Sequence, residues 1–168
     1  GADLGEIGGQ DASALKDMSE DERLKAAFER AFSLNKTLRA IETCGKPVAC
    51  AVNGLALGGG FEIALACHAR FAANDNPKLV FGLPESKVGL LPGGGGTQRL
   101  PRLIGLMGSS SYILEGKNMK PQEALGFGIV KELVPTAELV TKAKEWVKAN
   151  PNAKAPWDEK GFRFPGGV

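Results

Sequence analysis

Apolar positions recur at helical spacing in two long stretches of the chain, one in each half. Ser19 and Glu22 form a capping box ahead of apolar residues spaced three or four apart, which predicts an amphipathic helix over residues 20–42. Residues 136–150 repeat this spacing and predict a last amphipathic helix. Both helices are expected to bury one face against the rest of the domain.

Three further helices are expected between these two. Residues 61–70 are almost all apolar and predict a central helix that is buried on most sides. Thr97 can cap a helix over the next residues, with Pro101 either in its first turn or at a kink. Pro121 favours the start of another helix, because proline is tolerated at the first helical position.

Short apolar runs bounded by glycine, proline or asparagine predict strands. They are VACAVNG at 48–54, RFAA at 70–73, LVFG at 79–82 and IVKELV at 129–134. Strands that alternate with helices predict an α/β domain with a largely parallel sheet and surrounding helices. Residues 151–168 are rich in proline, glycine and aromatic side chains, have no period, and are expected to be a linker or a segment that docks elsewhere.

Length, charge and cysteine usage narrow the functional classes. The 168 residues suit one domain, and 21 basic against 19 acidic side chains are spread along the chain, which argues against nucleic acid. Cys44, Cys50 and Cys67 form no CxxC pair and no zinc-like spacing with His68, so we expect a reducing compartment and no metal. With no apolar run long enough for a membrane span and no signal peptide, the expected location is cytoplasmic.

The glycine-rich turn in ALGGGFEIAL, residues 56–65, follows a predicted strand and opens a predicted helix. Backbone N–H groups and the helix dipole meet there, and such a point binds an oxyanion or a phosphate. A dinucleotide fingerprint is a poor fit, because the sixth position is Ile63 counting from Gly58 and Gln98 counting from Gly93. No Walker A tripeptide occurs, and tight packing of helix on strand remains an alternative reading of the glycines.

Two carboxylates follow predicted strands in similar settings. Glu62 lies at the start of an apolar helix, and Glu85 follows a strand and a turn proline. Each could be an ordinary charge, at a helix N-terminus or on a surface loop. Facing each other across a crevice of one parallel sheet, however, they would suit proton transfer at the two ends of a polarised double bond. His68 is expected to be a packed histidine, and residues 109–111 lack a histidine partner for a hydrolase triad.

Two segments resemble the crotonase, or enoyl-CoA hydratase/isomerase, superfamily. They are KPVACAVNGLALGGGFEIALACHARFAA at 46–73 and FGLPESKVGLLPGGGGTQRLPRLIG at 81–105. The resemblance implies a crotonase-like fold for residues 1–150. The tail APWDEKGFRFPGGV resembles the connector that follows the hydratase domain in multifunctional fatty-acid oxidation proteins. Residues 151–168 would then be a linker toward a 3-hydroxyacyl-CoA dehydrogenase region.

The resemblance implies specific roles at matching positions. They are catalysis for Glu62 and Glu85, an oxyanion hole from the N–H groups of Ala2 and Gly59, and substrate binding at Gly93 and Gly58. The implied reaction is hydration of trans-2-enoyl-CoA, with enoyl-CoA isomerisation as a side activity. Hydration would need no cofactor, and NAD would serve only the missing dehydrogenase region.

The resemblance also bears on assembly and completeness. It implies an acyl-CoA substrate and an oligomer, or association with a thiolase subunit, in the intact protein. The chain starts inside the first oxyanion motif, so the N-terminal strands and the loop that clasps CoA are expected to be missing. The chain alone is therefore expected to show little hydratase activity. A crotonase-fold fragment that binds acyl-CoA or a partner without turnover is the alternative.

Overall fold

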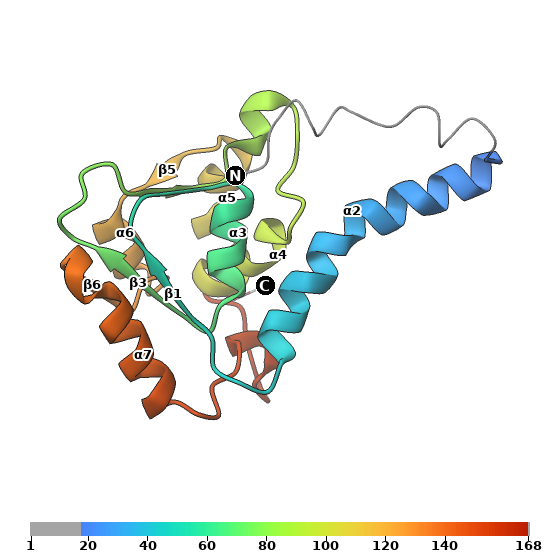
Figure 1. The fold of residues 1–168 in the computed structure, drawn as a ribbon. Helices are drawn as coiled ribbons and strands as arrows, with labels where there is room; N and C mark the ends of the chain where they lie inside the picture. The colour runs from blue at the N-terminus through green and yellow to red at the C-terminus, as the bar shows by residue number, and fades with distance from the viewer. Residues whose placement is uncertain (1–17, 168) are drawn as a thin grey trace.

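Helices and short strands alternate along the chain in the computed structural model, which describes residues 18–167 (Figure 1). The strands are β1 (Ala49–Val52), β2 (Leu55–Leu57), β3 (Ala69–Ala73), β4 (Val80–Gly82), β5 (Asn118–Met119) and β6 (Glu132–Val134). The helices are α2 (Glu20–Thr43), α3 (Gly59–Ala66), α4 (Gly96–Ile104), α5 (Leu106–Leu114), α6 (Pro121–Gly126) and α7 (Leu139–Ala149). Short 3-10 helices are η1 (Pro84–Val88), η2 (Thr136–Glu138) and η3 (Pro156–Asp158). The predicted α/β class is confirmed.

The strands form two three-stranded sheets, in the orders β1-β3-β6 and β2-β4-β5. The first sheet is parallel, with Ala51 opposite Phe71 and Ala72 opposite Leu133. In the second sheet β2 and β4 are parallel, whereas β4 and β5 are antiparallel. The expectation of a largely parallel sheet is therefore confirmed, with β5 as the exception.

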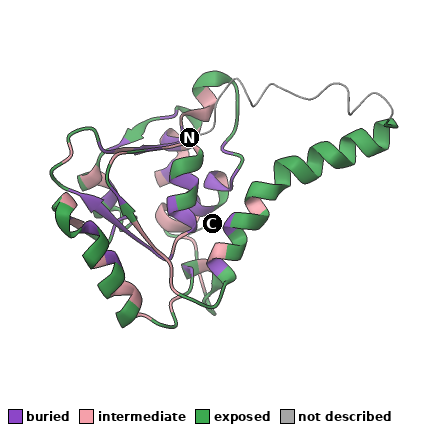
Figure 2. Ribbon diagram, viewed as in Figure 1, coloured by how far each residue is buried: buried purple, intermediate pink, exposed green. Residues whose placement is uncertain are grey.

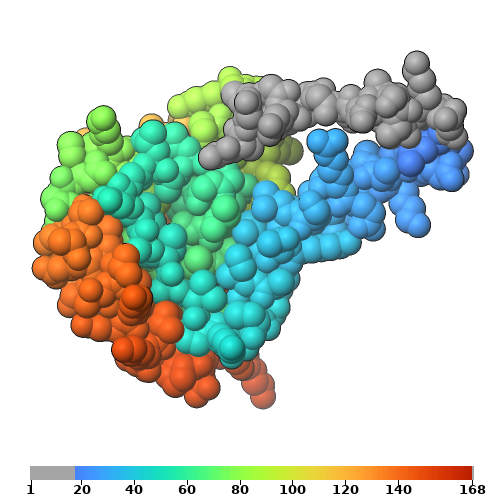
Figure 3. Space-filling view, viewed as in Figure 1, coloured from blue at the N-terminus to red at the C-terminus, as the bar shows by residue number. Residues whose placement is uncertain are grey.

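Helix α2 matches the helix predicted over residues 20–42, and its capping box is formed. The backbone N–H of Ser19 donates to a Glu22 carboxylate oxygen at 2.8 Å, and the Glu22 N–H donates back to the Ser19 hydroxyl. Only the last part of the helix packs on the body, where Leu38 and Glu42 are buried. The earlier turns extend away from it, so most of α2 is exposed (Figures 2 and 3).

Helix α3 is the central helix of the domain, and it packs against β2, α2 and α4 (Figure 1). The prediction that it continues to Arg70 is wrong, because the helix ends at Ala66 and β3 has begun by Ala69. The buried guanidinium of Arg70 donates to the Cys67 and Ala64 carbonyls at 2.6 and 3.1 Å. These bonds satisfy carbonyls that a continuing helix would otherwise have used.

Helix α4 begins earlier than predicted, and Thr97 does not cap it. Gly95 is the N-cap residue, with a φ of 100°, and Thr97 already lies inside the helix. Pro101 is also interior, so its expected place in the first turn is excluded. Helix α5, which follows after Gly105, was not predicted from the sequence.

The apolar core lies where α3 meets the strands. Phe61 of α3 and Phe81 of β4 are almost fully buried, with ring centroids 5.3 Å apart. Burial of a side chain of this size stabilises a fold by about 1.5 to 3 kcal/mol. This packing holds the N-terminus of α3 close to the end of β4. None of the helices in the described part of the chain is long and apolar enough to cross a membrane.

The segment after α7 packs back on the same domain within the described residues. Ala155 is buried, and Asp158 of η3 forms an ion pair with Arg39 of α2 at 2.6 Å. Farther along, the Arg102 guanidinium lies over the Phe164 ring, 5.2 Å from its centroid. Residues 151–167 therefore contact α2 and α4 of the same domain, and the expectation that they lead to a further region or dock elsewhere stays a prediction.

Candidate active site

The turn into α3 places an unpaired backbone donor at the surface. Gly58 has a φ of 54°, which favours glycine, and its N–H donates to the Gly82 carbonyl at 2.9 Å. Gly59, the first residue of the helix, is exposed, and nothing lies within 4 Å of where its β-carbon would be. Within residues 18–167 its N–H makes no hydrogen bond, as expected in the first turn of a helix.

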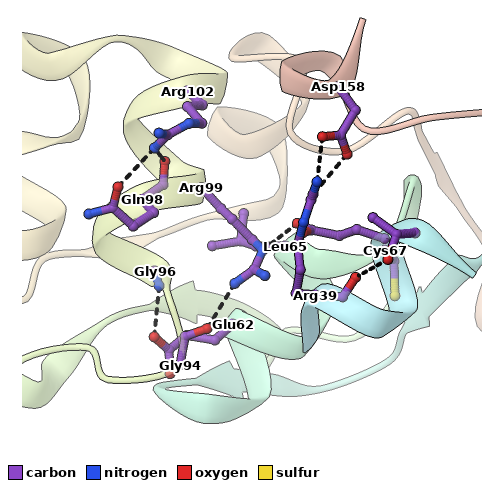
Figure 4. A network of polar contacts seen from close by, with 12 residues as sticks. Arg39, Glu62, Leu65, Cys67, Gly94, Gly96, Gln98, Arg99, Arg102 and Asp158 are labelled. Carbon is purple, nitrogen blue, oxygen red and sulfur yellow. Dashed lines mark hydrogen bonds and ion pairs between the residues drawn. The ribbon is translucent and has the colours of Figure 1, made fainter. Parts of the chain in front are cut away.

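Glu62 lies in the same turn of α3, but its side chain is only 2% exposed. Its Oε1 accepts a hydrogen bond from the Gly96 N–H at 2.7 Å (Figure 4). A β-carbon on Gly94 would lie 2.6 Å from Glu62 Oε2, and one on Gly96 would lie 3.1 Å from Oε1. These glycines, residues 94–96, form a second glycine turn, and they let its backbone approach a buried carboxylate closely.

Glu85 approaches the same helix N-terminus from η1. Its Oε1 lies 3.0 Å from where a β-carbon of Gly58 would be, and its Oε2 is buried without a hydrogen-bond partner within the described chain. Burial raises the pKa of the Glu85 carboxyl above its usual range, and the charge of Glu62 raises it further. A hydrogen bond from its own backbone acts in the opposite direction.

The structure thus brings Glu62 and Glu85 together at the N-terminus of α3, beside the open N–H of Gly59. One carboxylate is held by a backbone donor, and the other has a raised pKa. Two carboxyl groups in different environments are suited to separate roles in proton transfer. The N–H and the helix dipole next to them can stabilise an oxyanion.

Two other predicted site residues contribute less to this arrangement. Gly93 is exposed, and its carbonyl accepts a hydrogen bond from the Asn35 side chain at 2.6 Å. A role for it in lining a water site stays a prediction. Ala2, the second expected oxyanion donor, lies outside the described residues.

His68, Ser109 and Ser110, which the sequence did not favour as catalytic residues, make structural contacts. His68 is buried in the bend after α3, where its Nδ1 accepts from the Val48 N–H at 3.0 Å. Its Nε2 lies 3.1 Å from the Glu42 carbonyl, so that nitrogen carries the proton. The hydroxyls of Ser109 and Ser110 donate to backbone carbonyls of their own helix. Across residues 18–167, no group of histidine, cysteine and acidic side chains could hold a metal ion.

Sequence reasoning missed a buried ion pair behind the second glycine turn. Arg99 Nε donates to Glu42 Oε1 at 2.5 Å, and Arg99 Nη1 donates to the Gly94 carbonyl at 2.8 Å. Glu42 lies one turn after Leu38 on the buried face of α2. A carboxylate on the apolar face of a predicted helix was the one available signal, because buried charges are normally paired.

Comparison with known proteins extends these observations. The family model described as enoyl-CoA hydratase/isomerase matches residues 8–156. A solved structure of enoyl-CoA hydratase from Bacillus anthracis superposes with a TM-score of 0.66 and 38% identity. It covers 84% of this chain, which spans 52% of that hydratase. The predicted crotonase-like fold is confirmed by this likeness.

Longer curated proteins also match. A peroxisomal fatty acid beta-oxidation multifunctional protein of Arabidopsis thaliana is 41% identical over 150 residues, which are 89% of this chain and 20% of that protein. The fatty acid oxidation complex subunit alpha of Shewanella frigidimarina is 39% identical over 150 residues, or 89% of this chain and 21% of the subunit. The chain thus spans about a fifth of the length of these relatives.

Proposed function

The chain belongs to the enoyl-CoA hydratase/isomerase family, and from that premise we propose that it hydrates trans-2-enoyl-CoA thioesters in fatty-acid β-oxidation. The observation that carries the proposal is the pair of carboxyl groups, Glu62 and Glu85, beside the unpaired N–H of Gly59 at the N-terminus of α3. The names of the relatives from Arabidopsis and Shewanella support fatty-acid oxidation as the setting.

In the proposed mechanism, the Gly59 N–H binds the thioester oxygen. That contact stabilises the negative charge that develops as the double bond is attacked. Ala2 is proposed as the second donor. Glu62 holds a water and takes its proton as the oxygen adds to the β-carbon, and Glu85 delivers a proton to the α-carbon on the same face. The raised pKa of Glu85 supports its assignment as the proton donor.

A proton moved between two carbons of an enoyl thioester needs the same groups. Isomerisation of enoyl-CoA is therefore proposed as a side activity. The alternative is a domain that binds acyl-CoA or a protein partner without turnover. The raised pKa of Glu85 and the hydrogen-bonded Glu62 favour the catalytic proposal, because a binding site for a neutral acyl chain needs no buried carboxyl groups.

The first test replaces each carboxyl group in the full-length protein. We expect Glu62→Gln and Glu85→Gln each to lower kcat for crotonyl-CoA by about 10²- to 10⁴-fold, because a proton-transfer group is lost. Binding of the thioester, measured by calorimetry, should survive. Glu115→Gln, which removes an exposed carboxylate at the end of α5, is the matched control and should keep wild-type kcat.

The outcomes separate the proposals. Near wild-type turnover in either site variant would remove that residue from the mechanism. Tight binding of crotonyl-CoA by a wild-type protein that does not hydrate it would favour the binding-only alternative. Exchange of the substrate's γ-hydrogens with deuterated solvent would report isomerase activity independently of hydration, because hydration adds a solvent proton only at the α-carbon.

A second test removes the proposed oxyanion donor alone. Gly59 is the first residue of α3, where proline is readily accommodated, so Gly59→Pro should delete the N–H with little effect on the helix. Loss of one such donor raises the barrier by about 2.7 to 4 kcal/mol. We expect kcat to fall accordingly while circular dichroism and the unfolding midpoint stay close to wild type. Retained turnover in the folded variant would place the oxyanion hole elsewhere.

The wider setting of the domain is also proposed. Residues 1–150 would form the hydratase domain, and 151–168 would lead to a dehydrogenase region that uses NAD, with hydration itself needing no cofactor. An oligomer or a complex with a thiolase subunit is proposed for the intact protein. A cytoplasmic location stays a proposal, since the Arabidopsis relative has a peroxisomal name.

A further inference from the structure

The buried ion pair between Arg99 and Glu42 is the strongest polar feature outside the carboxyl pair. The side chains of Arg99 and Glu42 are 9% and 2% exposed, and their closest atoms are 2.5 Å apart. Removing two charges from water costs several kcal/mol per ion, and apolar replacements of such pairs are often equally stable. Stability is therefore a weak explanation for the pair, and its remaining contacts indicate another role.

Arg99 contacts the second glycine turn from two directions. Its Nη1 donates to the Gly94 carbonyl at 2.8 Å, and its backbone N–H makes the ordinary helical bond to the carbonyl of the N-cap residue Gly95 at 2.9 Å. Gly95 has a φ of 100° and packs directly against the Arg99 guanidinium. Consecutive glycines have no side chains that could restrict the turn, so its conformation depends on contacts of this kind.

In this conformation, the second glycine turn holds the Glu62 carboxylate. The Gly96 N–H donates to Glu62 Oε1 at 2.7 Å, and the Gly94 backbone lies against Oε2. Figure 4 shows Glu62, Gly96 and Arg99 close together, with Arg39 and Asp158 on the far side of Arg99. A shift of the turn by a fraction of an ångström would therefore move or release the Glu62 carboxylate.

Glu42 in turn fixes the Arg99 side chain. Its Oε2 accepts a hydrogen bond from Arg39 Nη1 at 2.9 Å, and Arg39 also binds both carboxylate oxygens of Asp158. Glu42 thus has a partner for each oxygen, one from α4 and one from its own helix. Because both oxygens are engaged, the guanidinium of Arg99 is held in one orientation, with Nη1 directed at the glycine turn.

We propose that Arg99, held by Glu42, is a positioning residue that fixes the Gly94–Gly96 turn and through the Gly96 N–H orients the Glu62 carboxylate. The kinetic consequence rests on the proposed hydratase function, whereas the effect on the turn does not. A second contact to the turn, from Asn35 to the Gly93 carbonyl, is exposed and acts two residues away from Gly95. It cannot replace the bond to Gly94.

The experiment compares two variants of the full-length protein. Arg99→Met alone leaves Glu42 buried with only Arg39 as partner, and a loss of stability is expected. The double variant Glu42→Leu with Arg99→Met removes both charges and keeps similar volumes, so it should recover stability. Arg102→Met is the matched control, because Arg102 lies one turn later on α4 and donates to Gln98 instead of the glycine turn.

Two readouts separate positioning from a structural role. Hydrogen exchange at the Gly96 amide should rise about tenfold in the double variant, as expected for a weakened hydrogen bond. The kcat for crotonyl-CoA should fall about 10- to 100-fold with KM little changed, because a misplaced catalytic group affects the reaction more than binding. The Arg102→Met control should match wild type in both measurements.

The contrary results are equally specific. A double variant with wild-type stability, wild-type Gly96 exchange and wild-type kcat would show that the ion pair does not fix the turn, and would overturn the proposal. Faster Gly96 exchange with unchanged kcat would also overturn it, since the turn would then not govern Glu62. If the wild-type protein itself lacks hydratase activity, the proposed function fails, and the exchange comparison still decides whether Arg99 fixes the turn.

Discussion

Glu62 and Glu85 lie at the same helix terminus, but the protein provides different hydrogen-bond partners for their carboxyl groups. Glu62 accepts a hydrogen bond from the Gly96 N–H, which compensates for its burial. Glu85 has a buried oxygen without a partner in the described chain, and burial is the main cause of its raised pKa. Protonation relieves that cost, since a neutral carboxyl is easier to bury than a carboxylate. The difference suits the proposed proton transfer, and it is costly for folding.

The raised pKa of Glu85 predicts a pH-dependent gain in stability on its removal. Folding makes the carboxyl hold its proton more tightly, so its stabilising contribution is full below the unfolded pKa and is lost as the pH rises through the folded pKa. We expect Glu85→Gln to be more stable than wild type at neutral pH, and this advantage to vanish below about pH 4. The measurement is the urea midpoint of both proteins over a pH series.

The control for this prediction is again Glu115→Gln, which removes one negative charge from an exposed position. Its midpoint relative to wild type should not follow the same pH dependence. A stability difference between wild type and Glu85→Gln that stays constant from acid to neutral pH would contradict the assignment of a raised pKa to this residue.

At the residue scale, sequence patterns identified the carboxyl groups but not what holds them. Glu62 and Glu85 each follow a strand and a turn, and their type, setting and family resemblance mark them together. Arg99 and Glu42 are 57 residues apart, and their pairing depends on how α2 crosses α4. Local sequence carries no information on such a crossing, so the support of the Glu62 site could be found only in three dimensions.

At the element scale, helices were predicted correctly where the apolar periodicity was strong. The prediction failed where tertiary contacts determine whether a helix forms or where it ends. The long stretch of helical periodicity in α2 predicted its C-terminal end to within one residue. The end of α3 was misplaced, because the Arg70 side chain satisfies its last carbonyls from a neighbouring strand. Helix α5 contains a glycine and three serines, which are poor helix formers, and it is held by burial of residues such as Tyr112.

At the scale of the whole molecule, β1 is an edge strand of its sheet in the described part of the chain. Within residues 18–167 it pairs with β3 on one side and with no strand on the other. Its residues are all apolar, and Ala49 and Ala51 line a groove with apolar side chains of α7 and with Lys144 and Lys148. Helix α7 packs on β1 and β3 and carries Val140 and Val147 into this groove. Ala51 is the exposed residue of β1, and an apolar edge strand is a template for pairing with another strand.

We therefore expect the 168-residue chain to self-associate through the β1 edge as its concentration rises. Ala51→Lys should suppress this association, because a lysine on an edge strand must bury its charge when a second strand pairs there. Ala149→Lys adds the same charge at the exposed end of α7, outside the groove, and should leave association unchanged. Sedimentation velocity over a range of concentrations measures the difference. A chain that stays monomeric throughout, or equal suppression by both lysines, would show that the β1 edge does not drive self-association.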